Sequence, residues 1–308
     1  MKTRGLPNSS TEIGKQSRTI QKLSVVVLSY NTKDTTLTCL KSLYEHAPTI
    51  AELETVVIDN ASSDESAKAI ERLFPQIKLI RNARNRGFAA ACNQGIRSTG
   101  GDIVLLLNSD TELIDQSLDV MLDFIERNPE VGIAGGAMIG ENGTPQATCQ
   151  HFPNYGNILF AKQSLLSSIK TFKKNFNKYR GAPEAVTDVD AIAGGFMFIR
   201  REAMRKVGLL DERFFFYVED LDLSKRMFQA GWRVVFVPQS KALHIGGKST
   251  ALKPTRCYWW HHESLYRYFT KHYRKYFLFN AILGVGLTGH FALWWLFRKL
   301  GLTKNGSN

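Results

Sequence analysis

The sequence predicts an α/β fold with a doubly wound, mostly parallel sheet, and two observations indicate it. First, short runs that are apolar or β-branched throughout alternate with longer amphipathic stretches from Leu23 onward, as expected for strands buried on both faces and joined by helical crossovers. Second, polar residues follow each apolar run. In such sheets ligands bind beyond the carboxyl ends of the strands, so these polar positions are the first candidates for chemistry.

The first half of the pattern contains four strands and three helices. The predicted strands are 23–29, 55–58, 78–80 and 103–107. Helical spacing of apolar residues, with a polar residue or a glycine at the start, predicts helices over 34–47, 64–74 and 87–98. The polar strand ends are Tyr30-Asn31, Asp59-Asn60, Asn82–Gly87 and Asn108-Ser109-Asp110.

The second half is less regular. A helix over 118–127 and a small-residue strand over 132–138 precede the least patterned part of the chain, 140–186. The basic cluster Lys170–Arg180 lies there and is interpreted as a solvated loop or helix face. The later elements are a strand over 191–199, an aromatic run over 214–217, an acidic helix start at 219–222, a strand over 233–237, and then His244.

Composition and charge exclude several classes of protein. With 44% hydrophobic and 22% charged residues, a chain of 308 residues buries a sizeable core and is not disordered. The net charge is +12, but it is unevenly distributed. Residues 1–22 carry five basic and one acidic side chains, residues 251–308 carry nine and one, and residues 23–250 carry 26 of each. A neutral body with basic ends favours an anionic membrane surface and excludes nucleic acid as the partner.

The compartment is predicted from the cysteines and the N-terminus. The four cysteines show no metal-ligand spacing, which is typical of a reduced cytosolic protein; they are Cys39, Cys92, Cys149 and Cys257. The basic, polar tail 1–22 lacks the apolar run of a secretory signal. We therefore expect the body to work on the cytoplasmic face of the cell membrane.

The C-terminal segment 251–308 is expected to be a helical, membrane-associating appendage. Its residues Tyr276–Phe297 contain no charged side chain and are bracketed by Arg274-Lys275 and Arg298-Lys299. This length is sufficient to span a bilayer. An interfacial hairpin and a buried pair of core helices are the alternatives. The mixture of aromatic and cationic residues in Tyr258–Tyr273 favours membrane contact.

Two carboxylates follow predicted strands, and each has two interpretations. Asp110 could hold Mg²⁺ or Mn²⁺ shared with a diphosphate, because hard cations prefer oxygen ligands; alternatively it caps the next helix beside Thr111. Asp59 could accept the N3–H group of a uracil or thymine ring, or cap the helix over 64–74.

Two further sites have the same ambiguity. Glu219, Asp220 and Asp222 could tune a general base near the aromatic run, or they could only compensate the helix dipole. His244, which precedes two glycines, could bind a ligand, or it could be a structural histidine whose ring is hydrogen-bonded within the protein.

Taken together and in order, five motifs resemble glycosyltransferase family 2 on its rhamnosyltransferase-like branch, over about residues 23–250. The motifs are Val25–Asn31, Val57–Asp64, Asn85–Ala89, Leu107–Thr111 and Gly208–Leu223. Five ordered motifs are far more specific than any one of them. The resemblance implies a GT-A fold, with a nucleotide-binding half over 23–138 and an acceptor-binding, catalytic half over 139–250.

The resemblance also implies roles for individual residues. Asp59 resembles the carboxylate that holds the pyrimidine, and Asp220 resembles the catalytic base. Asp110 resembles the last residue of the D-x-D metal motif, and His244 resembles the histidine that supplies another metal ligand or touches the diphosphate. The remaining implied residues are Ser29, Tyr30, Asn31, Arg86, Gly87 and Asn108 on the nucleotide-sugar side and Gly194, Gly195 and Glu219 on the acceptor side.

The chain departs from the family pattern at two positions. Asn108 stands where the metal motif often has its first aspartate, so one carboxylate is lost from that site. Ala191 follows Asp190 where the family often has tryptophan.

The implied activity is the metal-dependent, inverting transfer of a sugar from a nucleotide diphosphate donor. We expect rhamnose from dTDP-rhamnose, delivered to a lipid-linked or polysaccharide acceptor, with Mg²⁺ or Mn²⁺ as the cofactor. A transferase of UDP-hexose or UDP-hexosamine is an alternative, because thymine and uracil present the same N3–H edge. A non-catalytic carbohydrate-binding or membrane-binding relative is the second alternative. The sequence does not indicate the oligomeric state.

Overall fold

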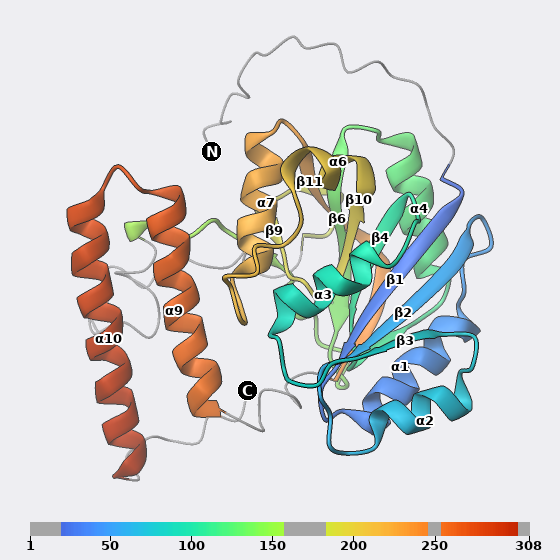
Figure 1. The fold of residues 1–308 in the computed structure, drawn as a ribbon. Coiled ribbons are helices and arrows are strands. Elements are labelled where there is room, and N and C mark those ends of the chain that lie inside the picture. Colours follow the sequence, from blue (N-terminus) through green and yellow to red (C-terminus); the bar gives the residue numbers. More distant parts are fainter. Residues whose placement is uncertain (1–19, 157–182, 246–253, 301–308) are drawn as a thin grey trace.

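A mixed β-sheet forms the centre of the molecule, with helices on both faces and a helical hairpin at one side (Figure 1). The computed structural model describes residues 20–156, 183–245 and 254–300. Within these residues the strand order is β3-β2-β1-β4-β10-β6-β11-β5, and β8 pairs with β11. The basic cluster Lys170–Arg180 and most of the tail 1–22 lie outside the described residues.

The first half of the sheet confirms the predicted parallel pattern. Each of its strands is parallel to its neighbour, and the chain passes between strands through helices. The strands are β1 Lys22–Ser29, β2 Glu52–Asp59, β3 Lys78–Arg81 and β4 Ile103–Asn108. The helices are α1 Lys33–Glu45, α2 Ser66–Leu73 and α3 Phe88–Arg97.

The second half mixes directions. Strand β10 (Phe196–Arg200) is antiparallel to both β4 and β6 (Val131–Ile139), and β11 (Arg233–His244) is parallel to β6. Two short strands, β5 (Thr111–Leu113) and β8 (Thr187–Asp188), pair antiparallel with β11. The helices are α4 Ser117–Arg127, α6 Arg201–Val207 and α7 Glu219–Gln229.

Two predicted strands differ from the structure. The strand predicted over 191–199 is interrupted: β9 (Ala191–Ile192) pairs with β7 (Cys149–Gln150), and β10 starts only at Phe196. The glycines between them direct their backbone groups to other partners, as described below. The strand predicted over 233–237 continues to His244, with a register shift after Val237, where Pro238 cannot donate to the ladder.

The core consists of two layers, one on each face of the sheet. Val25 and Val27 of β1 pack with Leu40 of α1 and Met121 of α4, while Val26 packs on the other face with the layer that contains α3, α6 and α7. Alternate residues of one strand therefore enter different layers. This explains why the strands are apolar throughout, as a doubly wound sheet requires.

The C-terminal segment forms two antiparallel helices, α9 (Pro254–His272) and α10 (Phe277–Lys299), and α9 lies between α10 and the body (Figure 1). Tyr268 and Phe269 of α9 are fully buried in a cluster with Phe214 and Leu221. The end of the predicted headgroup segment Tyr258–Tyr273 is therefore part of the folded body.

Helix α10 has a different environment. It is 23 residues long and contains an 18-residue window with a mean hydropathy of 1.5, of which only 6% is buried. Its length and composition are sufficient to cross a membrane, and its exposure contradicts the alternative of a buried pair of core helices. Exposed apolar side chains include Phe277, Ile282 and Val285, at 70%, 70% and 76%.

Candidate functional site

The polar strand ends of the first half meet at one edge of the sheet, and Asp59 is one of the buried acceptors among them. Its side chain is 4% exposed. Oδ2 accepts a hydrogen bond from the Ser62 amide at 3.3 Å, whereas Oδ1 has no hydrogen-bond partner among the described residues. The capping alternative is wrong, because Asp64 accepts the amide of Ser66 at the start of α2. A buried acceptor without a donor fits a ligand N–H group.

The three residues predicted around the nucleoside have different surroundings. Ser29 is fully buried, and its hydroxyl shares a hydrogen bond with Thr36 of α1 at 3.1 Å. Asn31, at a positive φ of 52°, accepts the amide of Ser63 through Oδ1 at 2.7 Å. Asn31 therefore fastens the loop after β1 to the loop after β2. Tyr30 lies between them, and both Tyr30 and Asn31 are half-buried.

Asn60 organises the loop after β3 and was not among the predicted site residues. It is 2% exposed. Its Oδ1 accepts hydrogen bonds from the Arg86 amide at 3.0 Å and from Asn82 Nδ2 at 3.1 Å, and its Nδ2 donates to Asn85 Oδ1 at 3.0 Å. The polar pair at the end of the second predicted strand was the signal for it. This bonding fixes the backbone of Arg86 and leaves its side chain exposed at the site edge.

Gly87 joins the two halves of the protein. It has a φ of 82°, and an added Cβ atom would lie 2.5 Å from the carbonyl oxygen of Phe215. The next amide, that of Phe88, donates to the same oxygen at 2.7 Å. Only glycine combines this backbone conformation with so close an approach. Gly87 therefore has a structural role at the predicted nucleotide-sugar edge, because it brings the segment before α7 onto the donor half.

Asp110 and His244, on different elements, lie close together. Strand β5 pairs His244 with Thr111, and His244 Nε2 lies 3.3 Å from Asp110 Oδ1. The capping alternative for Asp110 is wrong, because the residues that follow it form β5 and α4 begins only at Ser117. Asn108, at the end of β4, lies against Gly195, whose added Cβ atom would be 2.7 Å from Asn108 Nδ2.

Gln146, which sequence reasoning missed because it lies in the unpatterned region, orients the His244 ring. His244 Nδ1 lies 2.6 Å from Gln146 Oε1, and Gln146 Nε2 donates to the His244 carbonyl at 2.9 Å. An Nδ1–H group that donates to Gln146 leaves the Nε2 lone pair facing the Asp110 carboxylate. Partners of this kind commonly fix the tautomer of metal-ligating histidines.

The pair fits a divalent cation. A lone pair and a carboxylate 3.3 Å apart repel each other unless a cation or a proton lies between them, and oxygen and imidazole ligands suit Mn²⁺ or Mg²⁺. In the described part of the chain no group of three or more histidines, cysteines and carboxylates could hold an ion. Further ligands would therefore come from water and a bound diphosphate, as is usual for such ions.

The structure gives the three carboxylates at the start of α7 three different environments. Asp220 Oδ2 accepts the amide of Gly194 at 3.1 Å, and Oδ1 accepts the amide of Leu221 at 2.8 Å. Glu219 is 6% exposed, and its Oε2 has no partner among the described residues. Asp222 is fully buried and bonds to Arg226, Lys271 and His272. Only Asp220 faces the predicted acceptor segment.

Their pKa values separate in the same way. Burial raises the pKa of Asp220 against the opposing hydrogen bonds from backbone amides. Burial also raises the pKa of Glu219 well above its ordinary value, and the neighbouring charge of Asp220 adds to the effect. For Asp222, burial alone would raise the pKa. The hydrogen bond from His272 and the charges of Arg226 and Lys271 outweigh burial and lower the pKa below its ordinary value, so Asp222 is ionised at neutral pH.

Gly194 and Gly195 connect the metal edge to Asp220. The Gly194 amide donates to Asp220 Oδ2 at 3.1 Å, and the Gly195 carbonyl accepts the amide of Asn108 at 2.9 Å. These two bonds account for the interruption of the predicted strand over 191–199. Asp190, beside the unusual Ala191, lies 3.2 Å from His151 through Oδ2 and accepts the amide of Phe152.

We expect Glu219→Gln to change the pH dependence of stability. The folded protein retains the Glu219 proton above the ordinary pKa of 4.5, where the unfolded chain loses it, so this group lowers stability as the pH rises. The variant should lose that slope and gain stability relative to the wild type between pH 5 and pH 8. Urea unfolding at both pH values checks this; an unchanged pH slope would refute the assignment.

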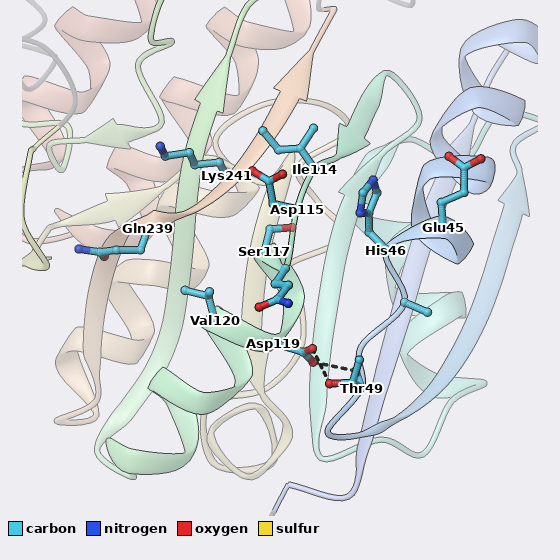
Figure 2. A pocket seen from close by; sticks show the side chains of 12 residues that line it. Glu45, His46, Thr49, Ile114, Asp115, Ser117, Asp119, Val120, Gln239 and Lys241 are labelled. Atoms are coloured by element: carbon cyan, nitrogen blue, oxygen red, sulfur yellow. Dashed lines mark hydrogen bonds between the residues drawn. The ribbon is translucent and has the colours of Figure 1, made fainter.

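A separate pocket of about 650 Å³ lies away from these residues and is drawn in Figure 2. It is lined by the end of α1, the loop after β5, the start of α4 and part of β11, including Glu45, Asp119 and Lys241. Helix α1 returns the chain to the opposite edge of the sheet from Asp59. The pocket contains none of the predicted site residues.

Comparisons with known proteins show the family and the fold. The family described as "Glycosyl transferase family 2" matches residues 24–208. The chain is 28% identical over 224 residues to the N-acetylglucosaminyl-diphospho-decaprenol L-rhamnosyltransferase of Mycobacterium tuberculosis, covering 68% of this chain and 72% of that protein.

Two solved structures share the fold. The mannosyltransferase PcManGT from Pyrobaculum calidifontis, in complex with GDP-Man and Mn²⁺, has a TM-score of 0.55 at 18% identity, over 92% of this chain and 81% of that one. GalNAc-T7 with UDP, GalNAc and Mn²⁺ has a TM-score of 0.56 at 19% identity, over 73% and 44%. The fold is thus of the GT-A type. Since the family match spans more than half of the chain, this protein belongs to glycosyl transferase family 2.

Proposed function

We propose that the protein is an inverting glycosyltransferase that moves rhamnose from dTDP-rhamnose to a lipid-linked or polysaccharide acceptor. The observation that carries the proposal is the buried, unpartnered Asp59 Oδ1 at the same sheet edge as the Asp110–His244 pair, with Asp220 joined to that edge through Gly194 and Gly195. An acceptor for a base, a place for a diphosphate and a carboxylate for proton transfer are the parts that this reaction needs.

Asp59 serves the donor base. Its free oxygen accepts the N3–H of a pyrimidine inside a buried site, where a charged acceptor contributes about 1.5–3 kcal/mol. Thymine and uracil both present this group, so Asp59 selects pyrimidines without separating dTDP from UDP. The choice of rhamnose is supported by the similarity to the mycobacterial L-rhamnosyltransferase.

Asp110 and His244 serve the diphosphate. A bound divalent cation there would stabilise the negative charge that develops on the leaving group. Asp110 and His244 supply two ligands, and Gln146 keeps His244 Nε2 directed at the site.

We expect Asp110→Ala to abolish turnover and weaken donor binding, because the Asp110–His244 pair loses its carboxylate. Rates with and without EDTA, together with the Mg²⁺ dependence of donor affinity, measure this. Gln146→Leu should lower the affinity for the metal by about 10- to 100-fold, because it removes the partner that orients His244. Turnover that persists unchanged in EDTA would remove the metal from the proposal.

Asp220 serves the acceptor. A hydroxyl of the acceptor attacks the anomeric carbon as the bond from that carbon to the diphosphate oxygen breaks, and the hydroxyl proton passes to the Asp220 carboxylate. A single displacement of this kind inverts the anomeric configuration. The raised pKa of Asp220 makes it a stronger base than an exposed carboxylate, and the Gly194 amide holds it in place.

We further propose that α10 and the basic C-terminal segment hold the enzyme on the cytoplasmic face of the membrane. Confinement to one surface would raise the local concentration of a lipid-linked acceptor, and each basic residue near anionic headgroups adds about 1 kcal/mol. The exposed apolar face of α10 adds burial that salt does not screen.

The full-length protein is expected to sediment with vesicles containing anionic lipid and to resist release by high salt in part. The double variant Ile282→Asp and Val285→Asp should remain in the supernatant, because both positions are exposed on α10 and a charge at the apolar core of a bilayer is costly. The matched control is Ile50→Asp with Leu73→Asp, two exposed apolar positions of the body. Equal sedimentation of both double variants would contradict the proposal.

A panel of nucleotide sugars tests the activity itself. Release of the nucleotide diphosphate is measured with Mg²⁺ and a polyprenyl-diphosphate-linked acceptor. We expect turnover of dTDP-rhamnose. Turnover of a UDP-hexose or UDP-hexosamine instead would establish the alternative donor on the same fold, and binding of no nucleotide sugar would support a non-catalytic relative.

A further inference from the structure

We propose that Trp260 and Ser264 of α9 are positioning residues for Asp220, so that the C-terminal hairpin completes the catalytic half. This inference rests on the function proposed above. It begins with the segment Phe214–Val218, which leads directly into Glu219 and Asp220.

The segment is held from two sides. On the donor side, the Phe88 amide donates to the Phe215 carbonyl at 2.7 Å. On the other side, Ser264 Oγ donates to the Phe216 carbonyl at 3.0 Å, and the rings of Trp260 and Phe215 lie 4.4 Å apart between centroids. Two successive carbonyls are therefore bonded to different parts of the molecule, the Phe215 carbonyl to α3 of the donor half and the Phe216 carbonyl to α9 of the C-terminal segment.

The backbone at the end of the segment is strained. Tyr217 and Val218 have φ values of 67° and 71°, a region that residues other than glycine rarely occupy and that is an outlier for β-branched valine. Such conformations persist only where the surroundings over-determine them, and they cluster at functional sites. Because α7 has no side-chain N-cap, the contacts of α9 and α3 with this segment set the direction in which Asp220 leaves it.

Helix α9 also holds the other side of Asp220. Lys271 Nζ and His272 Nε2 both lie 2.7 Å from Asp222 Oδ1, two residues beyond Asp220. One helix thus contacts the chain before and after the proposed base. These contacts involve the acceptor half and not Asp59 or Asp110, so loosening α9 should impair the chemical step and leave donor binding intact.

The test uses the full-length chain with Trp260→Leu and Ser264→Ala, singly and together. Two neighbouring positions are matched controls. Trp259 is 40% exposed and its ring contacts Phe291 of α10 at 5.0 Å, and the Thr270 hydroxyl bonds only to carbonyls of its own helix. Trp259→Leu and Thr270→Ala therefore disturb α9 without touching the segment.

We expect the double variant to lose at least about tenfold in kcat, since a misplacement on the order of 1 Å can cost ~10²-fold, while the donor KM and the dissociation constant of dTDP stay within about twofold. The controls should keep the wild-type kcat. Equal kcat values for the Trp260/Ser264 variants and the controls, with an active wild type, would overturn the inference.

Hydrogen exchange gives a readout that does not depend on activity. Amides of residues 214–222 should exchange faster in the Trp260/Ser264 variants than in the wild type and the controls, because local stability there depends on α9. Unchanged exchange would overturn the inference whether or not the wild type is active. A wild type that turns over no sugar would count against the proposed function alone.

Discussion

Asp220→Asn should lower kcat by about 10²- to 10⁴-fold, because it removes the proton acceptor while keeping the volume of the side chain. Donor affinity and the free energy of unfolding should change little, since the amide oxygen of the new side chain can still accept the Gly194 amide that now bonds to Asp220 at 3.1 Å. Initial rates, titration with dTDP and urea unfolding give the three values.

The pH dependence of kcat supplies the matching control. Base catalysis needs the ionised carboxylate, so the wild-type rate should rise with pH through a pKa above the ordinary 3.8. The Asp220→Asn variant should lose this acidic limb. Glu219→Gln should keep it, because this substitution leaves the Asp220 carboxylate in place and burial raises the pKa of Glu219 well above its ordinary value. Near-normal turnover by Asp220→Asn would reduce Asp220 to a carboxylate at the start of a helix.

Asp222→Asn should lower the free energy of unfolding by roughly 3 kcal/mol, because breaking a buried ion pair leaves uncompensated buried charge. Asp222 is fully buried and accepts from Arg226 at 2.9 Å as well as from Lys271 and His272. The cost falls at the low end of the usual range because Lys271 retains Asp211 as a partner. Urea unfolding at pH 7 measures the loss.

The sign of the pH effect provides a second check on Asp222. Its folded-state pKa is lowered from 3.8, so its stabilisation is complete above that value and is lost as the pH falls through the folded-state pKa. The difference between the wild type and Asp222→Asn should therefore shrink in acid. Asp188→Asn is the control: Asp188 pairs with Arg233 at 2.8 Å but is 63% exposed, and an exposed pair contributes about 0–1 kcal/mol. A loss for Asp222→Asn as small as that of the control would contradict the role given to this carboxylate.

The sequence was sufficient to predict the parallel half of the sheet, because strands buried on both faces must be apolar throughout. It was also sufficient to place Asp59 and Asp110 at strand ends. It could not predict that the strand over 191–199 breaks, since the partners of Gly194 and Gly195 are Asp220 and Asn108, far away in the sequence.

The sequence did not predict the residues that orient other site residues through hydrogen bonds. Gln146 is an ordinary loop glutamine until β11 brings His244 to it, and Asn60 acts through the backbone of Arg86. Ser29 resembles a nucleoside contact in its motif, but its hydroxyl faces Thr36.

The C-terminal segment shows a different limit of sequence reasoning. The aromatic and basic character of Tyr258–Tyr273 indicated a membrane surface, although Tyr268 and Phe269 are buried against Phe214 and Leu221. Composition alone does not distinguish a headgroup layer from an aromatic interface between helices.

Calorimetric titration with dTDP and Mg²⁺ tests the central claim, that the sheet edge at Asp59 binds a pyrimidine nucleotide independently of the base Asp220. We predict that the wild type and Asp220→Asn bind dTDP with dissociation constants within about twofold of each other. Asp59→Leu should bind at least about tenfold more weakly, the equivalent of one charge-assisted hydrogen bond. Absence of binding by the wild type, or equal binding by Asp59→Leu, would contradict the claim.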